Sequence, residues 1–163
     1  MSQYFDLGTY TRAITTHSDQ AREWVRRGLL WAYAFNHEEA VACFEQAVDA
    51  DPDCALAYWG QAYALGPNYN KQWETFDPDE ARSAIAQAHA AVANAQRHAA
   101  AATGAEQALV RALTYRYPEG VTPQDWSIWN HAYADAMRAT YREHPADLDV
   151  AVLFADALMN LTP

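Results

Sequence analysis

Apolar residues recur along the chain at spacings of three and four, the period of an amphipathic α-helix, and they do so in seven segments. Short polar stretches separate most of these segments, so consecutive helices are expected to pack as antiparallel hairpins. The pattern predicts helices at about residues 19–34, 37–50, 52–66, 78–100, 104–117, 123–143 and 146–161.

Capping residues stand where these helices are expected to begin. Ser18 precedes the first helix, and Asn36 with Glu39, like Thr103 with Glu106, forms a capping-box pattern. Three further starts are predicted from an acidic or hydroxyl residue followed by proline, a pair that favours the first turn of a helix: Asp51-Pro52, Asp77-Pro78 and Thr122-Pro123.

The stretch from Trp24 to Pro52 carries the most specific pattern. One face of its first helix and one face of its second are marked by large and small residues in a fixed order: Trp24, Gly28, Trp31, Ala40, Phe44 and Ala47. Tyr58 and Ala62 follow Trp24 and Gly28 after 34 residues, which is one repeat length. The stretch resembles the helix–turn–helix unit of the tetratricopeptide repeat family.

The resemblance implies an all-α fold, a right-handed α-solenoid of antiparallel helix hairpins with about seven helices. Residues 1–17 lack a clear period and are expected to form an N-terminal arm, and residues 18–163 the helical array. The segments YAFNHEEAVACF and DPDCALAYWGQAYALGPNYN resemble the N-terminal half of longer bacterial repeat proteins of unsettled activity. The last helix is very apolar for a capping helix, so we expect a truncated array; a final capping helix is the alternative.

Charge and composition limit the classes of partner that we expect. The chain of 163 residues has 21 acidic and 11 basic side chains, a net charge of −10, which disfavours nucleic acid and anionic membranes as partners. No apolar run approaches the ~20 residues of a membrane span, and the start has no signal-peptide pattern. Two cysteines fit a reducing compartment, so we expect a cytoplasmic protein.

The helical register predicts a binding groove. The first helix of each hairpin lines the concave side of such an array, and the side opposite its packing face is apolar and aromatic. We therefore expect a peptide or helical segment of another protein to bind there. The expected partner-binding residues are Arg22, Val25, Leu29, Tyr33, Leu56, Trp59 and Tyr63. The alternative is that the chain covers these residues itself, with its arm or with the loop at residues 66–76.

A second, polar constellation is predicted at that loop. The start of the second helix should lie near the end of the third, which brings His37 close to Asn68, Tyr69 and Asn70. These groups suit a small polar ligand, so the alternative function is a ligand-binding or enzymatic domain with its site here, although asparagines in a turn often bind only the turn backbone. No pair of histidines has ligand spacing, and no catalytic motif is present, so we predict no metal, no cofactor and no catalytic residues. Self-association through the last repeat is a third possibility.

Overall fold

The computed structural model describes residues 5–118 and 125–162, and within them every regular element is a helix. The all-α prediction is confirmed. The α-helices are α1 (Asp19–Tyr33), α2 (His37–Ala50), α3 (Ala55–Leu65), α4 (Pro78–His98), α5 (Gly104–Arg116), α6 (Ser127–Glu143) and α7 (Leu148–Met159), with short 3-10 turns η1 (Trp73–Thr75) and η2 (Ala99–Ala101).

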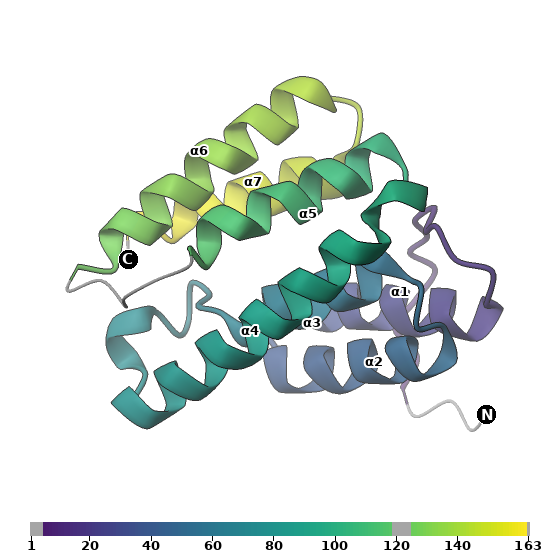
Figure 1. Ribbon diagram of the computed structural model, residues 1–163, viewed down its shortest axis with the longest axis horizontal. Coiled ribbons are helices and arrows are strands. Elements are labelled where there is room, and N and C mark those ends of the chain that lie inside the picture. The colour runs from purple at the N-terminus through teal and green to yellow at the C-terminus, as the bar shows by residue number, and fades with distance from the viewer. Residues whose placement is uncertain (1–4, 119–124, 163) are drawn as a thin grey trace.

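The helices form the expected hairpins. Helix α1 packs on α2, α3 on α4 and α5 on α6, while α7 packs on α6. The first helices of the hairpins also contact one another in order, α1 with α3 and α3 with α5. In Figure 1, α5, α6 and α7 lie together above the layer made by α1 to α4. The arrangement is that of a tetratricopeptide-like helical repeat.

Most helix starts are where the caps predict them. Ser18, Asn36, Asp77 and Thr103 each accept a hydrogen bond from a backbone N–H in the first turn of the helix that follows. The start of α3 was predicted wrongly: the helix begins at Ala55, after a turn over 51–54. The predicted start at 122–123 lies outside the described residues.

A single aromatic ring holds the first three helices together. Phe44 of α2 is fully buried, and its ring lies against Gly28 of α1 and Gly60 of α3. A methyl group at Gly28 would fall 2.7 Å from the Phe44 ring, and one at Gly60 would fall closer still. Glycine is needed at both positions because any side chain there would displace the ring. This contact explains the glycine and phenylalanine of the repeat pattern.

The loop between α3 and α4 supplies core packing for the second half of the array. Trp73 of this loop is 1% exposed and stacks on Trp126 with ring centroids 4.8 Å apart. The same ring meets Tyr117 and Trp129 edge-on, both at 6.2 Å. The loop is longer than a repeat turn because it carries this aromatic anchor to α5 and α6.

The Phe44 contact predicts that two glycine-to-alanine substitutions in helices have different effects on the stability of the fold. Gly60→Ala should destabilise the fold by about 1–3 kcal/mol, because overpacking against Phe44 outweighs the gain of about 1 kcal/mol in helix propensity. Gly104→Ala is the matched control, since its methyl would meet only His144 at an ordinary 3.4 Å. Urea unfolding of both variants measures the difference, and equal stabilities would contradict the packing argument.

Candidate functional site

The described part of the N-terminal arm lies along the helices and is extended from Thr9 to Ile14. From Thr9 to Ile14 its residues alternate between exposed and covered, with Tyr10, Arg12 and Ile14 on the covered side. Ile14 is 7% exposed and joins the hydrophobic core. A period of two is that of an extended strand, so every second side chain of the arm faces the protein.

The carboxylate of Asp149, in the first turn of α7, joins three parts of the chain. Its Oδ1 accepts hydrogen bonds of 2.6 Å from the hydroxyls of Tyr10, in the arm, and Tyr33, at the end of α1. Its Oδ2 accepts one of 2.6 Å from Arg12. Arg12 also donates to both oxygens of Asp147, at 2.8 and 3.1 Å. These contacts hold the arm between α1 and α7.

Other helix side chains hold the backbone of the arm. Arg26 donates to the carbonyl of Tyr10, and Arg22 donates to the carbonyl of Thr16 at 3.0 Å. Glu106 of α5 accepts from both the backbone N–H and the hydroxyl of Thr15, at 2.9 and 2.6 Å. The face of α1, α5 and α7 therefore binds an extended segment through its main chain and through alternate side chains. We call it the arm-binding face.

In the structure, the residues predicted to bind a partner fall into two groups, one at the arm-binding face and one buried. Arg22 and Tyr33 lie at the arm-binding face, where the first contacts the arm and the second binds Asp149. The other five are at most 2% exposed: Val25, Leu29, Leu56, Trp59 and Tyr63. They do not line an open groove, because α7 and the arm lie over this side of the array. The sequence alternative of self-covering named the arm and the loop at residues 66–76; helix α7 was not expected to take part.

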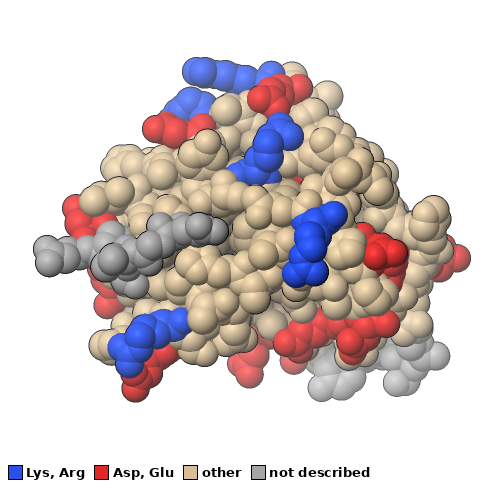
Figure 2. All heavy atoms as spheres, in the orientation of Figure 1, with Lys and Arg blue, Asp and Glu red and all other residues tan. Residues whose placement is uncertain are grey.

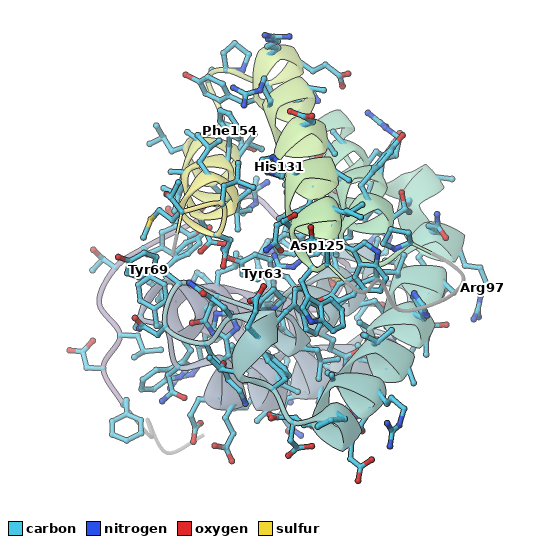
Figure 3. The ribbon with its side chains drawn as sticks, turned by 90° about the vertical axis from the view of Figure 1, so that its left-hand side faces the viewer. Tyr63, Tyr69, Arg97, Asp125, His131 and Phe154 are labelled. Carbon is cyan, nitrogen blue, oxygen red and sulfur yellow. The ribbon has the colours of Figure 1, made fainter. Side chains whose placement is uncertain are left out.

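A buried cation lies beneath α7. The guanidinium carbon of Arg116 is 4.8 Å from the ring centroid of Tyr63 and 4.7 Å from that of Tyr133. Its Nη2 donates to the carbonyl of Pro67, and Tyr63 donates to Asp156 of α7 at 3.0 Å. Figure 3 shows Tyr63 in the interior, at the foot of α6 and α7. No sequence pattern identifies Arg116, because Tyr63 and Pro67 lie in and just after α3, in another hairpin.

His37 lies beside the end of α3, as expected. Its Nδ1 donates to the carbonyl of Ala64 at 3.0 Å, and His37 and Asn68 line one pocket of about 490 Å³. Asn68 Oδ1 accepts from the backbone N–H groups of Asn70 and Lys71, so it stabilises the turn. Tyr69 is 45% exposed, and neither it nor Asn70 lines the pocket. The structure brings together two of the four predicted ligand-binding residues.

The surroundings shift the pKa values of several of these groups. Burial, reinforced by the negative charge of Asp149, raises the pKa of Tyr33, so this hydroxyl keeps its proton and remains a donor. Burial alone would raise the pKa of Asp147, but the hydrogen bond and charge of Arg12 and two backbone N–H donors together outweigh burial and lower that pKa. Burial, together with the charge of Arg116, lowers the pKa of His37. The arm-binding face therefore keeps the carboxylate of Asp147 ionised near neutral pH.

The surface agrees with the acidic composition. On the face shown in Figure 2, acidic side chains gather along one edge and basic ones stand apart in small groups. Among the described helices, none is long and apolar enough to cross a membrane. Nor do the described residues include a group of three or more histidine, cysteine, aspartate or glutamate side chains placed to hold a metal ion.

Residues 21–54 match the family model of the tetratricopeptide repeat. The match covers most of α1, all of α2 and the turn after it, which includes Gly28 and Phe44 but not Gly60. No curated protein and no solved structure matches the chain. The repeat and the all-helical fold together indicate a protein–protein interaction module.

Removing the arginine of the arm should destabilise the protein. Arg12→Ala leaves Asp147 and Asp149 without their cation, although their side chains are only 22% and 13% exposed. We expect a loss of about 2–4 kcal/mol in the free energy of unfolding. Arg111→Ala, which breaks an exposed ion pair with Glu143, is the control and should cost at most about 0.5 kcal/mol.

The same pair of variants tests the charge of the site. The stability that Asp147 contributes is present above its ordinary pKa of 3.8 and is lost as the pH falls through its lower folded value. The difference between wild type and Arg12→Ala should therefore shrink below pH 3.8 in urea titrations. A difference that is constant from neutral to acid pH would mean that packing, not charge, holds the arm.

His37 predicts a second pH dependence. Its pKa is lowered on folding, so the unfolded chain binds a proton more readily, and stability falls as the pH drops below the ordinary value of 6.5. His37→Asn should lose less stability than wild type between pH 7 and the onset of carboxylate protonation, near pH 4. His131→Asn is the control, because this side chain is exposed. Thermal unfolding across that range measures both slopes, and parallel wild-type and His37→Asn curves would contradict the assignment.

Proposed function

We propose that this chain is a protein-interaction module that binds an extended segment of a partner on the arm-binding face. One observation carries the proposal: residues 10–16 of the chain itself lie on this face in an extended conformation. The contacts that hold them are made to main-chain groups and to alternate side chains. An extended segment of another protein offers the same groups.

The arm gives the register of such a segment. Tyr10 reaches Asp149, Arg12 reaches Asp147 and Asp149, and Ile14 enters the core, each two residues after the last. A partner segment would need an aromatic residue, a basic residue and an aliphatic residue at the same spacing. Its main chain would take the bonds that Arg22 and Arg26 now give to the carbonyls of the arm.

Charge favours a basic partner segment. The face presents the three carboxylates of Glu106, Asp147 and Asp149, which outnumber the two guanidinium groups that α1 contributes, and the whole chain has a net charge of −10. An acidic surface of this kind steers positively charged segments towards it and discriminates against acidic ones. The five buried residues of the predicted groove then act as the support of the face, because they belong to the core that Ile14 joins.

The test supplies the arm as a separate peptide. A labelled peptide of residues 5–17 is titrated, with fluorescence anisotropy as readout, into the full-length chain carrying Arg12→Ala and Ile14→Ala, which weaken its own arm. We expect saturable binding to this variant and much weaker binding to wild type, whose face is occupied. Arg12→Ala in the peptide should raise the dissociation constant at least about tenfold, since a charged anchor contributes 1.4 kcal/mol or more.

A scrambled peptide of identical composition is the matched control, because it keeps the charge and loses the spacing. If the scrambled peptide binds as tightly as the native order, the face binds peptides of this composition without recognising their register, and the proposal fails. Failure of both peptides to bind, with the variant still folded by circular dichroism, would also contradict it.

A further inference from the structure

The outer face of α7 is apolar along its whole length. Leu148, Val152, Ala155 and Met159 are spaced by four, three and four residues, which places them on one side of the helix. Leu148 is 80% exposed, Val152 48% and Met159 39%, and Ala155 is exposed as well. We call these four residues the α7 stripe. A continuous apolar stripe of three turns differs from the single apolar residues that are normal on surfaces.

Contacts on both sides of the helix fix the stripe in this position. On one side, Asp149 and Asp156 accept hydrogen bonds from Tyr33 and Tyr63, which belong to α1 and α3. On the other side, Phe154 stacks on Tyr141 of α6, with ring centroids 5.7 Å apart. Figure 3 shows Phe154 on α7, close to α6. The helix cannot turn its apolar residues inward without breaking these contacts.

The stripe is also neutral in a strongly acidic chain. None of its four residues is charged, and the carboxylates beside it, Asp149 and Asp156, are engaged by hydroxyl and guanidinium donors. The chain as a whole carries a net charge of −10, so two copies repel each other, and most strongly where carboxylates would face carboxylates. Two copies can therefore meet at the stripe without bringing free carboxylates of α7 together.

We propose that a second copy of this chain binds the α7 stripe, with the two α7 helices antiparallel about a two-fold axis. The spacing of the stripe supports a second copy as the occupant, because the separations of four, three and four residues are the same from either end of the helix. In an antiparallel pair, Leu148 of each copy lies beside Met159 of the other, and Val152 lies beside Ala155. The small residues are at the centre, where the helix axes come closest, and the long ones are at the ends.

The length of the α7 stripe limits how tightly two copies can bind. It spans 11 residues of rise, about 16 Å, so the area buried lies at the small end for specific interfaces. We expect a dimer that forms reversibly as the concentration rises, with a dissociation constant in the micromolar range, about 1–100 μM. The arm-binding face lies on other side chains, so this proposal and the proposed function can fail separately.

Sedimentation velocity over a range of concentrations tests the proposal on the full chain. Wild type should pass from monomer to dimer, and Val152→Lys should raise the dissociation constant at least about tenfold by placing charge near the two-fold axis. Ile128→Lys is the matched control, since Ile128 of α6 is also an exposed aliphatic residue, at 61%, and lies outside the stripe. This control should dimerise like wild type, and circular dichroism should show all three folded.

A charge pair tests the antiparallel register. Val152→Lys and Ala155→Glu should each be monomeric alone and should form a mixed dimer at equal concentrations, because the two positions face each other across the axis. The proposal is overturned if wild type stays monomeric at all concentrations, including the case in which the stripe instead binds an added amphipathic helical peptide. It is overturned equally if the dimer survives Val152→Lys, or if the two variants fail to pair.

Discussion

The carboxylate of Asp149 is the contact on which the arrangement of this chain depends. It accepts hydrogen bonds from the arm through Tyr10 and Arg12 and from α1 through Tyr33. A buried carboxylate is costly unless it is paired and hydrogen-bonded, and here three donors from two other parts of the chain meet that requirement. Because Asp149 lies in the first turn of α7, satisfying it brings the last helix against the first. The array is closed on its inner side as a result.

That closure creates two surfaces of opposite character on either side of one helix. The inner side of α7 takes part in an anionic face that holds an extended segment through ionic and main-chain contacts. The outer side offers apolar side chains alone. Salt screens the first kind of contact and leaves the second intact or strengthens it. Ionic strength therefore separates the two kinds of association physically, without any mutation.

Local features of the fold were predictable from the sequence, and contacts between distant segments were not. Phe44, Gly28 and the caps at Ser18 and Thr103 act within one hairpin or one helix turn, where spacing alone fixes which residues meet. The start of α3 was predicted wrongly because Asp51 does not cap a helix. Its carboxylate accepts hydrogen bonds from the hydroxyl of Thr16 and the backbone N–H of Asp53.

The candidate site shows the same division. Arg22 and Tyr33 were found from their helical register, but the residues that give them partners, Asp149 and Glu106, lie in α7 and α5. No periodic pattern connects Thr15 with Glu106, 91 positions later, or Arg12 with Asp149, 137 positions later. Trp59 is 1% exposed, although helical register alone predicts that it lines an open groove.

These long separations also order the assembly of the chain. Helices α1 and α2 and the Phe44 contact need only neighbouring residues, whereas Arg12 must wait for Asp147 and Asp149, more than 130 residues later. A ribosome synthesising 5–20 residues per second makes that interval last roughly 7–30 seconds. During this time the first hairpin can fold while its arm lacks the part of its docking surface that α5 and α7 supply. The first segment to be made is among the last to be placed.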